Sequence, residues 1–286
     1  YLLAALDTAM TAAKPSFAND ALYRRDMGNY AVVSCYNTLP VGGCGLTLVR
    51  LNMNRLPELA KSSEDLLDRV IPDAVTAVCD AIDSRCRFIV EDCSYYENTF
   101  LYREGLIKKD RDHMVGMFGY VGLAECVNRT LGLTEEKERF GHGEKADAFG
   151  EAIMNRIKEE LDKRPAAYGT YGLHAQVGVM EDTDSTPGGR IPIGEEPDLP
   201  YQLLNFIRMH RHCAAGCGEL FPFDGTVKNN PRYLMDILKG AFASGARYLS
   251  FYSGNSDLVR VTGYLVKRSD IEKFEREEMT LNEATV

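Results

Sequence analysis

Two short stretches near the start of the chain have the hydrophobic pattern of β-strands. Residues 30–33 form an apolar run, and residues 46–52 alternate between apolar and other side chains. Such alternation places successive side chains on opposite faces of a strand. The segment between them, residues 34–45, is too rich in glycine and proline to continue either strand. We therefore predict two strands joined by an irregular loop.

Apolar residues recur at helical spacing in two longer segments. From residue 56 to residue 90 they lie on one helical face, and Pro72 should divide or kink this helix because proline lacks a backbone N–H. A second amphipathic helix carries four apolar side chains on one face, namely Phe149, Ile153, Ile157 and Leu161. Residues 1–29 are expected to begin with a short helix, which a loop at residues 14–20 follows.

The last part of the chain has clear start and stop signals. Asn230 and Pro231 mark the start of a helix for which Gly245 is a plausible stop, and residues 248–252 then have the pattern of a strand. Ser269 with Glu272 predicts a capping box at the start of a final helix. Strands separated by helices in this way predict an α/β fold.

Composition excludes several classes of protein. The chain has 286 residues, of which 45% are hydrophobic, enough for one large domain or two small ones. Its net charge is −9 and its basic residues are scattered, so nucleic acid is not an expected partner. We also expect no membrane partner, since no apolar run is long enough to span a bilayer and the start lacks the basic region of a signal peptide. The missing initiator methionine indicates a fragment or a processed piece.

The eight cysteines do not form a regular framework for a chain of this length; they are residues 35, 44, 79, 86, 93, 126, 213 and 217. Disulfide-rich scaffolds are usually short and secreted. Together with the absence of a secretion signal, this spacing predicts reduced thiols and a cytoplasmic location.

The most specific motif is the run Arg260-Val-Thr-Gly-Tyr264, close to the C-terminus. In that frame Gly263 resembles the radical-bearing glycine of the glycyl radical enzymes. Glycine suits this chemistry because it has no Cβ, which lets the backbone follow a tight loop. It also lets the α-carbon flatten on losing a hydrogen atom, so that the unpaired electron spreads over the flanking amides. The alternative is an ordinary turn glycine after a strand.

A stored glycyl radical needs a relay, and a thiol is the natural one because sulfur gives up its hydrogen readily. Cys35 fits this role, since it follows the apolar run at residues 30–33 and opens the glycine-rich turn. Cys44, at the end of the same loop, is the second candidate. The alternative for either cysteine is a buried small hydrophobe, which is how most free cysteines behave.

Four segments carry a resemblance to known families; they are residues 15–20 (PSFAND), 34–40 with 46–53 (SCYNTLP and LTLVRLNM), 118–125 (FGYVGLAE) and 260–264. They resemble segments of anaerobic ribonucleotide reductases and of the pyruvate formate-lyase type, and their combination is most similar to the YjjI-like glycyl radical enzymes. The resemblance runs along nearly the whole chain.

The resemblance implies the C-terminal half of a ten-stranded α/β barrel, with barrel residues 1–240 and a glycyl radical domain at residues 241–286. It implies an oxygen-sensitive, anaerobic enzyme of lyase or oxidoreductase type that acts on a small molecule. A radical S-adenosylmethionine activase would install the radical on Gly263, and no other cofactor or metal is expected. The missing N-terminal half of the barrel is an expected partner, and a homodimer is left open.

Two other groups of residues have competing interpretations. His210, His212, Cys213 and Cys217 offer four metal-competent side chains, but zinc sites with four cysteines need a second pair and no cysteine follows Cys217. Incidental positions are therefore favoured over a metal site. The carboxylates at residues 181, 182 and 184 offer a general base, although a solvated acidic loop is the favoured interpretation.

Two further functions compete with a radical enzyme of this kind. An anaerobic ribonucleoside-triphosphate reductase would account for part of the resemblance, but the missing cysteine pair weakens it. A non-catalytic radical-domain protein would replace the damaged glycine of another enzyme, but such proteins keep only the region around the glycine. The long region before Gly263 and the presence of Cys35 weaken that alternative.

Overall fold

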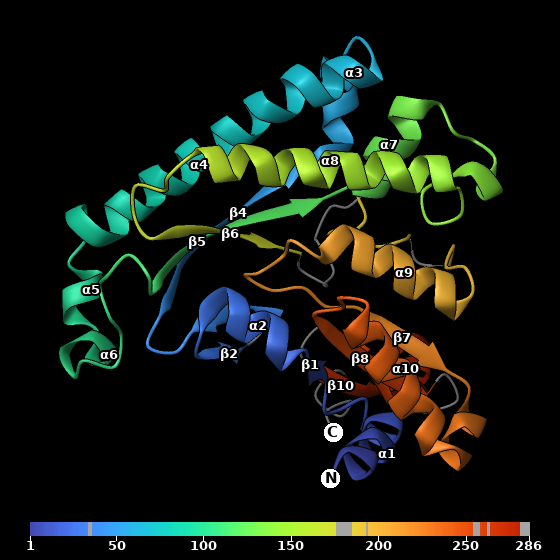
Figure 1. Cartoon of the computed structure of the whole chain (residues 1–286). Coiled ribbons are helices and arrows are strands. Elements are labelled where there is room, and N and C mark those ends of the chain that lie inside the picture. Colours follow the sequence, from blue (N-terminus) through green and yellow to red (C-terminus); the bar gives the residue numbers. More distant parts are fainter. Residues whose placement is uncertain (34–35, 176–184, 193, 254–257, 262–263, 281–286) are drawn as a thin grey trace.

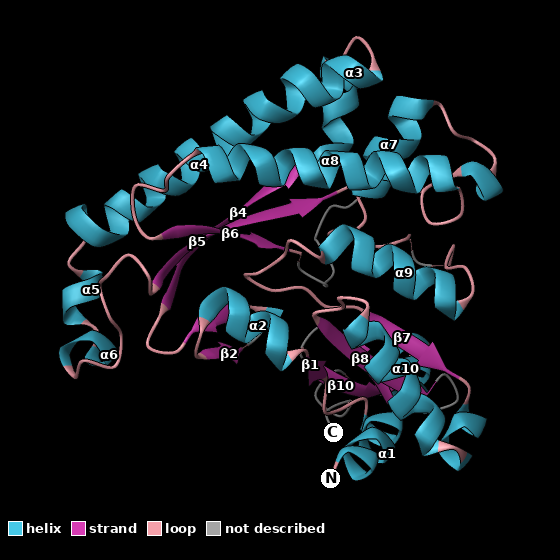
Figure 2. Cartoon of the chain, viewed as in Figure 1, coloured by secondary structure: helices cyan, strands magenta, loops and turns pink. Residues whose placement is uncertain are grey.

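The computed structural model describes residues 1–33, 36–175, 185–192, 194–253, 258–261 and 264–280. Figures 1 and 2 show helices layered over one side of a sheet, with a second strand-and-helix unit beside it. None of the helices in these described ranges is long and apolar enough to cross a membrane.

The elements before the first long strand are short; they are α1 (Leu2–Ala12), β1 (Phe17–Ala18), α2 (Asp20–Met27), β2 (Tyr30–Val32) and β3 (Thr38–Pro40). β2 and β3 pair antiparallel, with Ala31 opposite Leu39. The strand predicted over residues 30–33 is thus confirmed, but the expectation that residues 34–45 form no strand is wrong at β3 and at residues 44–45, which begin the next strand. Pairing with β2 supplies the hydrogen bonds that local composition does not predict.

A parallel sheet follows, formed by β4 (Cys44–Asn52), β5 (Met114–Val121) and β6 (Thr170–His174). β4 includes the whole of the strand predicted at residues 46–52. Between β4 and β5 lie η2 (Met53–Leu59), α3 (Ser63–Asp65), η3 (Leu66–Val70), α4 (Ile71–Arg87), η4 (Phe88–Asp92), α5 (Tyr95–Asn98) and α6 (Phe100–Arg103). Between β5 and β6 lie α7 (Leu123–Leu131), η5 (Glu136–Glu138) and α8 (Glu144–Lys163).

The remaining elements are α9 (Leu199–His210), β7 (Leu220–Phe223), η6 (Gly225–Asn229), α10 (Pro231–Ala243), β8 (Tyr248–Ser253), β9 (Leu258–Val261), β10 (Tyr264–Lys267) and α11 (Arg268–Glu275). β7 and β8 are parallel, and β1 adds antiparallel to β8. A parallel bridge between Ala175 and Cys217 joins the end of β6 to the segment that leads into β7. The described strands β4 to β8 therefore form one series of five neighbours in chain order.

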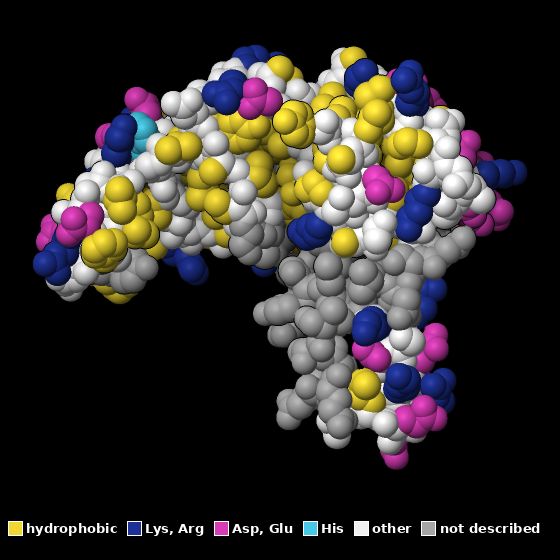
Figure 3. Space-filling model, turned by 90° about the horizontal axis from the view of Figure 1, so that it is seen from below, with side chains coloured by type: hydrophobic (Ala, Val, Ile, Leu, Met, Phe, Trp, Pro, Cys, Tyr) yellow, Lys and Arg dark blue, Asp and Glu magenta, His cyan; other side chains and the backbone are white. Residues whose placement is uncertain are grey.

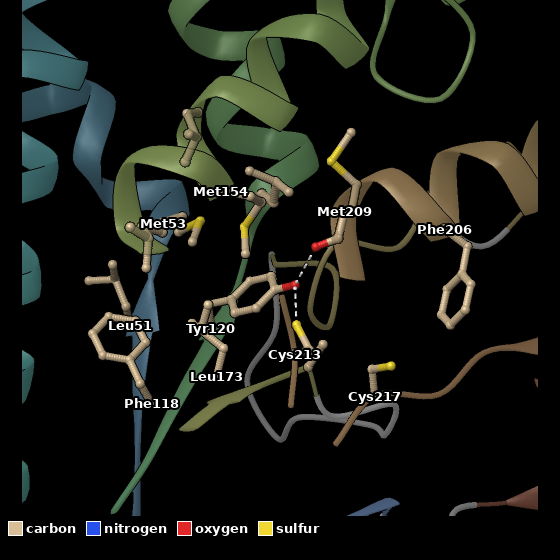
Figure 4. Close-up of a cluster of buried hydrophobic side chains, with 14 of the residues drawn as sticks. Leu51, Met53, Phe118, Tyr120, Met154, Leu173, Phe206, Met209, Cys213 and Cys217 are labelled. Atoms are coloured by element: carbon tan, nitrogen blue, oxygen red, sulfur yellow. Dashed lines mark hydrogen bonds between the residues drawn. The ribbon is translucent and has the colours of Figure 1, made fainter. Parts of the chain in front are cut away.

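Helices α4 and α8 cover one face of the sheet (Figure 1). Phe118 and Tyr120, alternate residues of β5, are fully or almost fully buried on this face in the main core. Gly116, two residues earlier on the same face, leaves space for α4, since a Cβ there would lie 2.5 Å from a methyl carbon of Ile82. Figure 4 shows part of this core around Tyr120.

The opposite face of the sheet, the inner face, has a different character. Because side chains alternate along a strand, its residues on β5 are the odd-numbered ones, and the register places Arg50, Gly119 and His174 in one row across β4, β5 and β6. A Cβ at Gly119 would lie 2.8 Å from the Arg50 side chain, so the glycine leaves room for arginine to lie across β5. Figure 3 shows hydrophobic side chains spread over the underside of the molecule.

The loop predicted at residues 14–20 is wrong at β1, because Phe17 and Ala18 pair with β8. Among the helices, some predicted boundaries agree with the structure and others do not. The helical run predicted over residues 56–90 is interrupted at residues 60–62, between η2 and α3. Pro72 does not end the helix: it lies in the first turn of α4, directly after the π-helical turn η3, and the Ile71 N–H before it still bonds to the Leu66 carbonyl. Asn230 caps α10 by accepting a hydrogen bond from the Tyr233 N–H. The predicted capping box is wrong, because α11 begins at Arg268 and Lys267 occupies the cap position, so Ser269 already lies in the helix.

Candidate functional site

The two residues predicted to carry the radical chemistry, Cys35 and Gly263, lie outside the described residues. Their neighbours in the chain are described. Tyr36 directly follows Cys35 and is buried, with a positive φ of 62° that is unusual for a residue with a side chain. Its ring lies edge-on to the ring of Tyr248, the first residue of β8, with the ring centres 5.0 Å apart.

Two glycines make room for Tyr36. A Cβ at Gly218 would lie 2.8 Å from the Tyr36 ring, and a Cβ at Gly216 would overlap the Tyr36 carbonyl oxygen. The N–H of Thr38 also donates a hydrogen bond of 2.9 Å to the carbonyl of Ala215. The chain next to Cys35 is therefore held against the segment that leads into β7 and against the start of β8.

Gly263 lies between two strands that the sequence pattern did not predict. β9 and β10 pair antiparallel, and Val261 is the partner of Tyr264. This hairpin follows β8 in the chain and precedes α11. Four residues on each side of a glycine give too short a pattern to be recognised as strands from the sequence alone.

Cys44, the second candidate for the relay, lies elsewhere in the fold. It is the first residue of β4, opposite Met114, and it packs against the main core. Burial raises the pKa of its thiol. β4 is at one end of the strand series and β8 is at the other, so Cys44 is remote from the strand that Tyr36 contacts.

The described cysteines are all free thiols. Burial raises the pKa of several of them, to about 11 for Cys79, Cys86 and Cys213 and to about 12 for Cys126. These groups stay protonated at neutral pH and behave as small hydrophobes in the core.

The four residues of the suspected metal cluster have separate partners. The Gly189 N–H donates to His210 Nε2 at 3.1 Å, and the Arg211 Nε–H donates to His212 Nε2 at 3.2 Å. The sulfur of Cys213 lies 3.5 Å from the Tyr120 hydroxyl, and Figure 4 shows that Cys217 is not part of this contact. In the part of the chain that the structure describes, no group of three or more His, Cys, Asp or Glu side chains is arranged to hold a metal ion.

Burial also fixes the protonation state of this cluster. It lowers the pKa of His210 to about 3, with a further decrease from the nearby Arg190 guanidinium. The imidazole is therefore neutral at physiological pH and acts as an acceptor for the Gly189 N–H. This is the behaviour of a neutral histidine packed in the core.

A buried ion pair that sequence reasoning missed lies beside the same strands. Arg190 Nε lies 2.6 Å from a carboxylate oxygen of Glu219, whose side chain is only 4% exposed. Tyr252 of β8 lies near both, and its pKa is raised mainly by burial. Removing either partner of such a buried pair would be strongly destabilising, because it would leave an uncompensated charge in the interior. Residues this far apart in sequence give no local signal of their pairing.

The carboxylates at residues 181, 182 and 184, for which a solvated acidic loop is the favoured interpretation over a general base, lie outside the described residues. The described residues that follow them are anchored at the carboxyl ends of β4 and β5. Ser185 donates to the Asn52 side chain at 3.2 Å, and the Thr186 N–H donates to Glu125 at 3.0 Å. The chain therefore returns to the sheet at the edge where α/β proteins commonly build their sites.

A family model decides the relationship of this chain to known proteins. The model described as "Glycyl radical enzyme YjjI-like" matches residues 1–286, the whole chain. The chain belongs to the YjjI-like glycyl radical enzymes. The resemblance inferred from the sequence motifs is thus confirmed.

Two curated relatives extend this match. An uncharacterized protein of Haemophilus influenzae is 39% identical, over 98% of this chain and 56% of its own length. The uncharacterized protein YjjI of Escherichia coli is also 39% identical, over 92% of this chain and 52% of its own length. The chain therefore spans about half the length of the curated relatives it matches.

Solved structures agree on the fold. Hydroxyproline dehydratase from Clostridioides difficile aligns with 97% of this chain and 46% of its own, with a TM-score of 0.66 at 12% identity. An anaerobic ribonucleotide reductase aligns with 83% of this chain and 43% of its own, with a TM-score of 0.65 at 18% identity. The fold-class prediction is confirmed, since a series of five parallel strands corresponds to half of a ten-stranded barrel.

Proposed function

We propose that this chain is the catalytic C-terminal part of a glycyl radical enzyme, in which Gly263 stores the radical and Cys35 abstracts hydrogen from a small organic substrate. The observation that carries the proposal is the contact between Tyr36 and Tyr248. It joins the residue next to Cys35 to the strand that precedes the β9–β10 hairpin, which flanks Gly263. Two segments more than 200 residues apart in sequence are thereby attached to one another.

The partners follow from the same proposal. A radical S-adenosylmethionine activase would remove the hydrogen atom from Gly263 in the cytoplasm of an anaerobic cell. The polypeptide that completes the barrel would cover the inner face, where Arg50 and His174 lie in one row across the strands. The division into a barrel part at residues 1–240 and a radical domain at residues 241–286 stays a prediction. The reaction is of lyase or oxidoreductase type in this proposal.

Activation of the protein tests the proposal directly. After anaerobic treatment with its activase and S-adenosylmethionine, we expect an electron paramagnetic resonance doublet from one α-hydrogen coupling at Gly263. Exposure to air should then cut the backbone at Gly263 and release a C-terminal peptide of about two dozen residues, which mass spectrometry detects. Gly263→Ala is the control and should give neither the doublet nor the fragment. An equal doublet in Gly263→Ala would show that the radical resides elsewhere.

The competing reductase function predicts a different result. A ribonucleotide reductase of this type would need a nucleotide pocket and normally a four-cysteine zinc site. In this structure the Cys213 thiol contacts the Tyr120 hydroxyl and the Cys217 thiol contacts Tyr23. We expect the purified protein to hold little zinc and to show no thermal stabilisation by ribonucleoside triphosphates. A ligand at one hundred times its dissociation constant would stabilise by about 2.7 kcal/mol, which is readily measured. One equivalent of zinc together with such a shift would favour the reductase.

The non-catalytic radical-domain protein remains the second alternative. It accounts for the β9–β10 hairpin but not for the five parallel strands that precede it, nor for the anchoring of Tyr36 on β8. A protein that only supplies a fresh glycine has no use for a cysteine relay. For this reason the catalytic function is the one the geometry supports best.

A further inference from the structure

A groove of about 540 Å³ lies between α2, α8, α9 and the turn that joins α10 to β8. Its volume is in the range of small-molecule sites. Its lining contains none of the inner-face residues Arg50, Gly119 and His174, and neither Tyr36 nor Tyr248. Whatever it binds is therefore separate from the proposed radical site.

Arginine dominates the charged lining of this groove. The guanidinium groups are those of Arg25, Arg208, Arg211 and Arg247, whereas the acidic lining residues are Glu144 and Asp147. Asp147 is already engaged, since it accepts hydrogen bonds from the Tyr201 hydroxyl at 2.8 Å and the Gly141 N–H at 2.7 Å. Ion pairs hold the arginines in place, with Arg208 2.7 Å from Glu144 and Arg211 2.9 Å from Glu151.

One of these arginines keeps a free donor. Arg247 is 4% exposed; its Nε donates to the carbonyl of Arg211 at 2.9 Å and its Nη2 lies 2.6 Å from Asp26. Its Nη1 is buried and has no hydrogen-bond partner among the described residues. A guanidinium group has five N–H donors, so the pair with Asp26 does not exhaust it. A second anionic oxygen would complete its bonding.

A second unsatisfied group lines the groove at Asn205 of α9. Its side chain is 2% exposed, and neither the amide oxygen nor the amide nitrogen has a hydrogen-bond partner among the described residues. An unpaired buried amide is destabilising, and such groups are rare in folded proteins. An amide presents a donor and an acceptor side by side, so it pairs best with a ligand edge that offers one of each.

We propose that this groove binds a small organic anion, whose carboxylate or phosphate lies among the arginines and whose amide-like edge pairs with Asn205. Leu22, Leu204 and Ile207 supply apolar walls for the part of the molecule between these two ends. Each end of such a ligand would bind one of the unsatisfied groups. The anionic end would accept a hydrogen bond from Arg247 Nη1, and the amide-like edge would pair with the side-chain amide of Asn205.

Paired probes measure both recognition elements by isothermal titration with the full protein. Succinamate and succinate share a carboxylate, but only succinamate has an amide; adenosine 5′-monophosphate and ribose 5-phosphate share a phosphate, but only the nucleotide has a donor–acceptor edge. We expect at least one edge-bearing probe to bind with a dissociation constant of about 1 mM or below, and about tenfold tighter than its partner. The pair that binds identifies the source of the anionic group.

Substitutions separate binding from folding. Asn205→Leu should abolish the preference for the edge-bearing probe and also raise the melting temperature of the unliganded protein, because it removes an unpaired buried amide. Arg208→Gln should weaken binding about tenfold or more, since it removes a charge from the lining. Arg156→Gln is the matched control, because Arg156 lies on α8 outside the groove and pairs with Glu160, so affinity should not change.

Two results would overturn the proposal. One is that neither edge-bearing probe binds at about 10 mM, which would mean that buried water molecules, and not a ligand, satisfy these groups. The other is that Asn205→Leu keeps the full preference of the unmodified protein. Both results leave the glycyl radical proposal untouched, since the doublet at Gly263 does not depend on this groove.

Discussion

Cys35→Ser should lose all measurable turnover while it still accepts the glycyl radical. In the proposed mechanism the activase acts on Gly263 directly and not through the thiol, so the electron paramagnetic resonance doublet should keep its full intensity. The serine O–H bond is too strong to give its hydrogen atom to the glycyl radical, and the chain of hydrogen transfers stops there. Radical content by spin counting and substrate consumption, measured on the same sample, check both halves of this prediction.

Cys44→Ser is the matched control, because it makes the same chemical change in a thiol nine residues after Cys35. Cys44 packs against the main core at the start of β4, at the other end of the strand series from β8, which Tyr36 contacts. We expect this variant to keep most of its activity and to lose some stability through the polar hydroxyl in an apolar site. Full activity in Cys35→Ser would refute the relay, and equal loss in both variants would indicate two thiols acting in series.

The elements that the sequence predicted well are those whose own residues carry the signal. β4 alternates along its length, α8 has a stripe of apolar residues and α10 has an asparagine cap followed by proline. Their local pattern and their tertiary role agree. β3 was not predicted, because its pairing with β2 is decided by the partner strand rather than by its own composition.

The sequence motifs predicted which residues carry the proposed chemistry, but not their surroundings. The runs around Cys35 and Gly263 identified the family, because radical storage requires glycine and the relay requires sulfur. The surroundings of those residues could not be predicted in the same way. Tyr36 against Gly218, or Arg190 against Glu219, are contacts between distant segments that only the folded chain brings together. Such contacts decide what a site binds, so the substrate class was beyond a single sequence.

Among the described glycines that contact Tyr36, Gly216 is the one at which an added methyl group, as in Gly216→Ala, should be most damaging. Gly216 has a φ of 127°, a region that residues with a Cβ avoid, and an added Cβ would overlap the carbonyl oxygen of Tyr36. The carbonyl oxygen is a backbone atom and the Cβ is bonded directly to the backbone, so no side-chain rotation relieves the clash. We expect the free energy of unfolding to fall by about 3–4 kcal/mol, and turnover to be lost because Tyr36 moves together with its neighbour Cys35.

Gly132→Ala provides the comparison that isolates the clash. Gly132 ends α7 with a φ of 66°, also positive, but no atom lies within 4 Å of the place where its Cβ would be. The cost there should be that of the left-handed conformation alone, about 1 kcal/mol, with turnover unchanged. Chemical denaturation gives the two free energies, and assays at a temperature where both variants remain folded give the two activities. The opposing result would be that Gly216→Ala and Gly132→Ala show the same loss of unfolding free energy and the same turnover. That result would show that the packing of Tyr36 against Gly216 does not position Cys35, and only the contact between Tyr36 and Tyr248 would then support the proposed site.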